Sequence, residues 1–251
     1  MRPAPIRAPH PRVILQITKR KRGQGGHAGL ASRSRWISRG LAGLGLTVIG
    51  VMVAACGAPQ FTYVANSASQ TYFKVPNGWH KMSDTALARA LGGSNSATIP
   101  NGVWSVGYDG SAVPSAAHIL GASATQPFVL ALVEPLSAAA MNAMSYNTLR
   151  DVFLPVTPAD RQSAAGRGFG LTGFHLLQDA VLTPGQGVHG VRDIFNYTFP
   201  NGSTDTFDQI AFTNANATRL YLLVLHCTAS CYTKHASEID TVMKSFTVRS
   251  S

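Results

Sequence analysis

The chain has 251 residues, of which 45% are hydrophobic and 13% charged, and its formal net charge is +10 at pH 7. That charge lies in one segment, because 10 of the 21 Lys and Arg residues precede Cys56, whereas all 11 Asp and Glu residues follow it. The 11 basic and 11 acidic residues after Cys56 cancel, so the larger part of the chain is neutral. A neutral body has no overall attraction for DNA, RNA or an anionic membrane, which excludes a nucleic-acid-binding domain.

The segment before Cys56 has the features of a bacterial lipoprotein signal peptide. Its basic residues are followed by an apolar run of 15 residues, Leu41–Ala55. This run is shorter than the ~20 residues that a helix needs to cross a bilayer, and it matches the apolar core of a secretory signal. Two small residues, Ala54 and Ala55, precede the cysteine. We therefore predict that Cys56 is the lipidated residue of the mature protein.

In this interpretation the Cys56 thiol takes a diacylglyceryl group, the bond before it is cleaved, and its new amino group is available for acylation. Two or three acyl chains hold a protein stably on a membrane, so the predicted location is the extracytoplasmic face of the cell membrane. The alternatives are a buried helix, an uncleaved membrane anchor, or a chance cysteine after an apolar run.

The predicted organisation is a signal peptide over residues 1–55, a lipidated cysteine and tether over residues 56–69, and one α+β domain over residues 70–251. Forty residues precede the apolar run, which is long for the basic part of a signal. Either the true start lies downstream, with Val13 as one candidate, or the leader is extended.

The domain is predicted to begin with a strand and a helix. Tyr72–Val75 has strand character, and the Pro76–Trp79 segment that follows contains Pro and Asn-Gly, which favour a turn. Ser83 and Asp84 can cap a helix over Thr85–Leu91, with Gly92 as its stop.

The middle of the domain contains a predicted buried strand between less regular segments. A strand is expected over Val103–Tyr108, whereas Ser111–Gln126 is rich in Ala and Ser and does not favour one structure. Phe128–Val133 is a continuous apolar run, which indicates a strand buried on both faces. Ser137 is expected to cap a helix over Ala138–Phe153, which Pro155 and Pro158 would end.

Four strands joined by short turns are predicted in the last third of the chain, followed by a helix. Connections this short require antiparallel neighbours, so the four strands form a meander. They cover Phe174–Leu182, Val188–Phe199, Thr204–Phe212 and Arg219–Cys227. A stripe of apolar residues at helical spacing predicts a final helix over about Tyr232–Phe246. A meander with flanking helices indicates an α+β sandwich.

These pieces resemble the PsbP-like proteins. The segment from Tyr72 to Trp79 is similar to their opening strand and P-x-G-W turn, and the meander with a helix ending at Met243–Phe246 is similar to their C-terminal half. Within that superfamily the chain is most similar to the LpqN/LpqT-type lipoproteins of actinobacteria, which also begin at a lipidated cysteine. The resemblance implies an antiparallel sheet between layers of helices and a non-catalytic role at the cell surface.

Cys227 and Cys231 form a C-x-x-x-C pair between the last strand and the last helix, and several interpretations remain open. A disulfide would close a small loop and contribute about 2 kcal/mol, and it suits a protein outside the cytoplasm. Zinc binding would add His226 or His235, but cysteines that bind structural zinc usually lie closer together, and four ligands are needed. A redox pair usually has the C-x-x-C spacing, and free thiols are the remaining option. The disulfide is the prediction that we carry forward.

Two functions from different classes fit the sequence. The first is a membrane-anchored envelope protein whose domain binds a protein or lipid partner, without a catalytic residue, metal or cofactor. The second is a secreted hydrolase or thiol-redox enzyme whose site is assembled from distant residues, with the scattered histidines, Asp208 and the cysteine pair as candidate parts. Convergence of such side chains in the folded chain would favour the second function.

Overall fold

The computed structural model describes residues 60–92, 98–119 and 124–249. The predicted signal peptide and Cys56 lie outside the described residues. The described strands are β1 (Phe61–Asn66), β2 (Thr71–Pro76), β3 (His80–Lys81), β4 (Trp104–Asp109), β5 (Phe128–Pro135), β6 (Thr172–Gly185), β7 (Val188–Thr198), β8 (Thr204–Thr213), β9 (Arg219–Thr228) and β10 (Thr247–Val248). The described helices are α1 (Asp84–Gly92), α2 (Ala138–Asn142), α3 (Tyr146–Arg150), α4 (Pro158–Ala165), α5 (Ala229–Lys234) and α6 (Ala236–Lys244), with short 3-10 helices η1 (Ser67–Ser69) and η2 (Ala116–Ile119).

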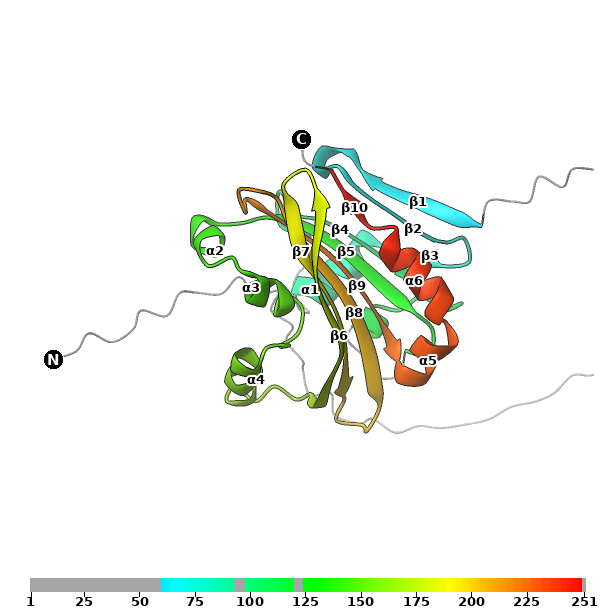
Figure 1. Ribbon diagram of the computed structural model, residues 1–251. Coiled ribbons are helices and arrows are strands. Elements are labelled where there is room, and N and C mark those ends of the chain that lie inside the picture. Colours follow the sequence, from blue (N-terminus) through cyan, green and yellow to red (C-terminus); the bar gives the residue numbers. More distant parts are fainter. Residues whose placement is uncertain (1–59, 93–97, 120–123, 250–251) are drawn as a thin grey trace, which may run out of the picture. The chain divides into compact units, whose positions relative to one another are not determined.

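A seven-stranded antiparallel sheet forms the centre of the described domain. Its order is β3-β4-β5-β9-β8-β7-β6, so the predicted meander of four strands is confirmed as β6 to β9 (Figure 1). Strand β5 lies between β4 and β9, and its residues Phe128–Val133 are buried, as their continuous apolar run predicted. In the turns after β6 and β7, Gly185 and Gly202 adopt positive φ angles, which glycine accepts without steric cost.

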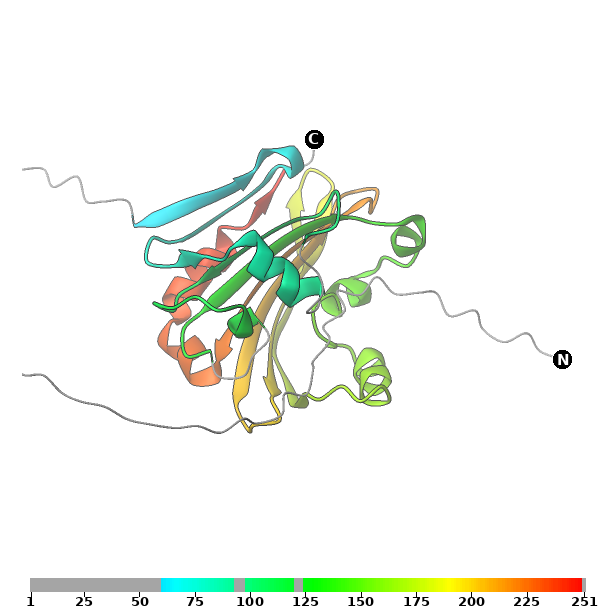
Figure 2. The same cartoon turned by 180° about the vertical axis from the view of Figure 1, so that it is seen from behind.

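Helices cover both faces of this sheet. On β9, Leu223 points into a core shared with Ile239 and Met243 of α6, and Leu222 points into the opposite core with Leu87 of α1 and Leu149 of α3. Successive side chains of a strand point to opposite faces of the sheet, so β9 is buried on both sides. The predicted α+β class, with an antiparallel sheet between helical layers, is confirmed (Figure 2).

A second, three-stranded sheet packs beside α6 and consists of β1, β2 and β10. Strand β1 pairs with β2 along its whole length, from Phe61 opposite Pro76 to Asn66 opposite Thr71. The Asn66 side chain then accepts from the backbone of Ala68 and Ser69 and caps η1. The predicted tether over residues 56–69 is therefore wrong for residues 61–69, because residues 61–66 form a strand paired with β2 and residues 67–69 form η1.

Two predicted helices are each divided in the structure. The helix expected over Ala138–Phe153 is wrong in its middle, where the Ser145 hydroxyl accepts from the Thr148 backbone N–H at 3.1 Å and caps α3 as a new helix. The final helix is divided into α5 and α6 at His235. Helix α4 is an addition to the predicted elements, with Thr157 as its cap and Pro158 at its first turn.

Within the described residues, no helix has the length and hydropathy that a membrane span requires.

Candidate functional site

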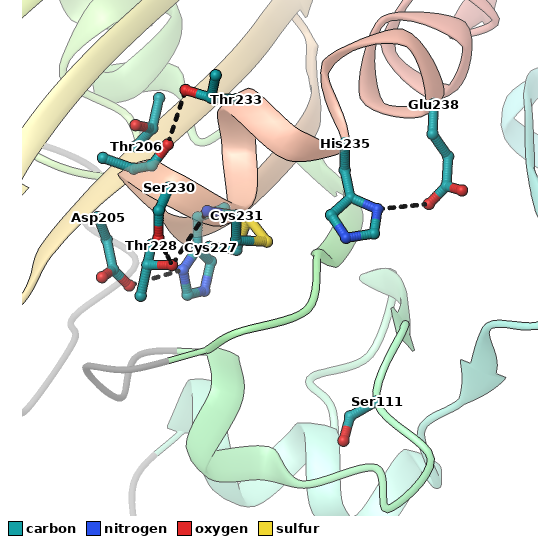
Figure 3. Close-up of a disulfide and its surroundings, with 12 residues drawn as sticks. Ser111, Asp205, Thr206, Cys227, Thr228, Ser230, Cys231, Thr233, His235 and Glu238 are labelled. Carbon is teal, nitrogen blue, oxygen red and sulfur yellow. Dashed lines mark hydrogen bonds and ion pairs between the residues drawn. A yellow bond between two sulfur atoms is a disulfide. The ribbon is translucent and has the colours of Figure 1, made fainter.

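The structure joins Cys227 and Cys231 by a disulfide that ties the end of β9 to helix α5 (Figure 3). Both side chains are buried, and their Cα atoms lie 5.9 Å apart. The hydroxyl of Thr228 accepts from the Cys231 backbone N–H at 3.3 Å and caps α5. With the two sulfur atoms bonded to each other, this structure has the arrangement of the disulfide interpretation rather than that of a zinc site or of free thiols.

Two of the histidines, His118 and His226, lie beside different carboxylates, and Nδ1 of His226 is 3.6 Å from Asp205. His226 is buried, with Nε2 2.8 Å from the Ile119 carbonyl oxygen and its ring stacked on Phe207. His118 lies 2.6 Å from Asp109, whose carboxylate also accepts backbone N–H groups of the loop that follows. Among the described residues, no three His, Cys, Asp or Glu side chains come together as a possible metal site.

Asp208 belongs to a buried ion-pair network on the α5–α6 side of the large sheet. Its two carboxylate oxygens accept from Nε and Nη2 of Arg192 at 2.9 and 2.7 Å, and the Tyr232 hydroxyl donates to the same carboxylate at 2.9 Å. The hydrogen bond to Asp208 is the main cause of a raised pKa for Arg192, and burial is the main cause of a raised pKa for Tyr232. The network links β7, β8 and α5, so its role is to fix these elements together.

A second charged cluster lies on the opposite face of β7. Asp193 is fully buried and stands opposite Asp179 of β6, and Arg150 of α3 contacts both carboxylates. Arg150 pairs with Asp179 at 2.9 Å but remains 3.8 Å from Asp193. Burial, followed by the neighbouring Asp179, raises the pKa of Asp193 to about 7, although Arg150 opposes the shift. This cluster was not predicted, although adjacent Arg192 and Asp193 within an apolar strand were a visible signal of buried charge.

An open groove lies between the start of β1 and helices α5 and α6, and we take it as the candidate binding site. It has a volume of about 460 Å³. The apolar wall comes from Phe61 and Pro76, which are paired across β1 and β2, and the opposite wall is polar. The lining residues are Gln60, Phe61, Pro76, Lys234, His235, Ser237, Glu238 and Thr241.

Trp79 holds one side of this groove in place. Its indole Nε1 donates to Glu238 at 3.1 Å, and the same carboxylate lies 3.8 Å from Nδ1 of His235. Figure 3 shows His235 and Glu238 pointing toward each other beyond the disulfide. Trp79 closes the turn after β2, so a residue of the predicted P-x-G-W motif connects the small sheet to α6.

The protein is therefore an α+β domain with two features near helices α5 and α6. One is the disulfide, and the other is an open groove that begins at the first residues of β1. No family model and no curated protein matches the chain.

Solved structures with a similar arrangement include the cyanobacterial PsbP protein CyanoP from Synechocystis sp. PCC 6803, at 13% identity and a TM-score of 0.45, covering 77% of this chain and 95% of that one. The Ran-binding protein Mog1p of Saccharomyces cerevisiae is similar at 10% identity and a TM-score of 0.42, covering 75% and 95%. LpqN of Mycobacterium tuberculosis, a protein involved in cell envelope biogenesis, is similar at 16% identity and a TM-score of 0.39, covering 76% and 91%.

Proposed function

We propose that this protein is a lipid-anchored, non-catalytic protein of the cell envelope, of the PsbP-like LpqN/LpqT type, whose domain binds a protein or lipid partner. The observation that carries the proposal is the lipoprotein signal that ends at Cys56. The folded domain begins close to that residue, since the Gln60 carbonyl already accepts from the Asn77 backbone N–H at 3.1 Å. Phe61, the first residue of β1, is five residues after Cys56, so the chain between them can span at most about 18 Å.

The groove is the proposed binding site because Gln60 and Phe61 line it and lie next to the anchor in sequence. An apolar wall facing a polar wall suits an amphipathic partner, such as an envelope lipid or a protein segment with one apolar face. The disulfide and the Trp79–Glu238 hydrogen bond support the wall formed by α5 and α6.

The variant Cys56→Ala is expected to lose lipid incorporation completely, because the acylated thiol is absent. Growth of the host with labelled palmitate, followed by purification and detection of the label, measures this loss. A double variant of Cys227 and Cys231 to alanine is the matched control and should retain the label. Equal labelling of wild type and Cys56→Ala would contradict the proposed anchor.

A photo-reactive benzophenone side chain at Ser237 is expected to form a covalent adduct with an envelope component in intact cells. Ser237 is exposed at the groove, so the probe would reach a bound partner without disturbing the core. The matched control carries the same side chain at Gln162, an exposed residue of α4. Gel mobility and mass spectrometry report the adducts, and equal adduct formation at the two positions would rule out the groove as the binding site.

A further inference from the structure

The small sheet has one buried face and one open face. Along β1 and β2, Val64, Phe73 and Val75 point into the core, so their neighbours Tyr63 and Lys74 point outward. We call the outward side the outer face of the small sheet, and it carries Phe61, Tyr63, Tyr72, Lys74, Thr247 and Arg249. None of the described helices or strands lies across this face in Figures 1 and 2, and Phe61, at one end of it, also lines the groove beside α5 and α6.

Aromatic rings and cations alternate on the outer face. The Lys74 ammonium lies 4.4 Å from the centre of the Phe61 ring, and the Arg249 guanidinium lies 5.4 Å from that of Tyr72. Tyr63 is directly opposite Lys74 and is 79% exposed, the largest exposure among the large hydrophobic residues described. The residues assigned to this face include no Asp or Glu, so it carries two positive charges although the region after Cys56 is neutral.

We propose that the outer face of the small sheet lies against the anionic phospholipid surface of the membrane to which Cys56 anchors the protein. The proposal rests on the proposed function, because the anchor supplies the proximity. Phe61 is five residues after Cys56, which limits its distance from the anchor to about 18 Å. Such a short link holds the face at a high effective concentration near the lipid headgroups.

The chemistry of the face fits a membrane interface. Tyrosine favours the headgroup region, where its ring contacts apolar chains and its hydroxyl remains hydrated. Lysine and arginine are attracted by anionic headgroups, at about a fivefold gain in binding for each cation near the surface. The region after Cys56 is neutral as a whole, but two of its cations, Lys74 and Arg249, lie together on this face.

The test uses the mature, lipidated protein reconstituted into vesicles. Tyr63→Cys is labelled with an environment-sensitive maleimide fluorophore, because Cys56 is acylated and Cys227 and Cys231 are bonded to each other, which leaves the thiol introduced at position 63 as the reactive one. The wild-type protein should take up no label. Quenching by lipids that carry a spin label near the headgroup is compared in phosphatidylglycerol and phosphatidylcholine vesicles, and Gln162→Cys on α4 is the matched control.

We expect strong quenching at position 63 in phosphatidylglycerol vesicles, weaker quenching in phosphatidylcholine vesicles, and little quenching at position 162 in either. Adding Lys74→Gln and Arg249→Gln should lower the ratio of docked to undocked protein by roughly 25-fold, and quenching in phosphatidylglycerol should fall to the phosphatidylcholine level. Equal quenching at positions 63 and 162, in protein that floats with the vesicles, would overturn the inference and leave the anchor intact. That result would also be the outcome if the face binds an acidic protein instead. Failure of the protein to float with vesicles would overturn the proposed anchoring itself.

Discussion

Replacing Asp208 with alanine is expected to lower the free energy of unfolding by about 3–5 kcal/mol, because it leaves a buried guanidinium without its partner. Arg192 makes two hydrogen bonds to this carboxylate, and the Tyr232 hydroxyl makes a third. Asp240 lies 3.7 Å from Arg192 but is 45% exposed, so it is a weak substitute. Urea denaturation followed by circular dichroism measures the change.

Asp240→Ala is the matched control, and its expected cost is at most about 1 kcal/mol because the Asp240 carboxylate is exposed to solvent. The double variant Arg192→Met with Asp208→Leu removes both buried charges together and should recover much of the stability lost by Asp208→Ala. A loss below about 1 kcal/mol for Asp208→Ala would show that the network does not hold β7, β8 and α5 together.

The contribution of Asp193 to the free energy of unfolding is also expected to fall as pH rises from about 4 to about 7, because this carboxyl must lose its proton in a buried position. Its pKa is raised from 3.8 to about 7, so the folded state binds more protons than the unfolded state across this range. The stabilising contribution of the protonated Asp193 carboxyl is fully present below pH 3.8. It is lost as pH rises through 7 and does not change further above that value. A shift of this size sets an upper limit of about 4 kcal/mol, and we expect about 2–3 kcal/mol.

Asp193→Asn should remove this part of the pH dependence and stabilise the domain at pH 8, because the amide carries no charge to bury. The measurement is the difference in the free energy of unfolding between variant and wild type, from urea denaturation at each pH, which cancels the contributions that the two proteins share. Glu134→Gln removes a less buried carboxyl, whose pKa burial also raises, and provides a comparison away from the Asp179–Asp193 pair. If the free energy of unfolding changed with pH in the same way in Asp193→Asn and in wild type, the raised pKa of Asp193 would be contradicted.

Much of the sheet could be predicted because its signals are local. The Phe128–Val133 run is apolar throughout since β5 is covered on both faces, and the turns after β6 and β7 contain Gly residues at positive φ. The break between α2 and α3 also has a local signal, the capping residue Ser145. It was missed because Ser145 lies within a longer apolar periodicity that favoured one continuous helix. Strand β1 was missed although Phe61, Thr62, Tyr63 and Val64 have strand propensity, because the partner that pairs with this segment, β2, is not visible in its own sequence.

The candidate site could not be predicted because its walls come from opposite ends of the domain. Phe61 and Ser237 share the groove, and no spacing or composition in the sequence connects them. The cysteine pair was visible because its two members are four residues apart. Trp79 was visible as part of a turn, but its bond to Glu238 crosses 159 residues and needed the folded chain.

The small sheet also constrains the order in which the protein can fold during its synthesis. Strand β2 has β1 on one side and β10 on the other, and the backbone N–H of Lys74 donates to the Ser245 hydroxyl across 171 residues of sequence. A chain that leaves the ribosome from its N-terminus therefore lacks the second neighbour of β2 until Thr247 and Val248 have been synthesised. Long-range contacts of this kind form slowly and late. Strand β2 can therefore be fully paired only after β10 has been made. A nascent chain that stops before Thr247 would expose the unpaired edge of β2.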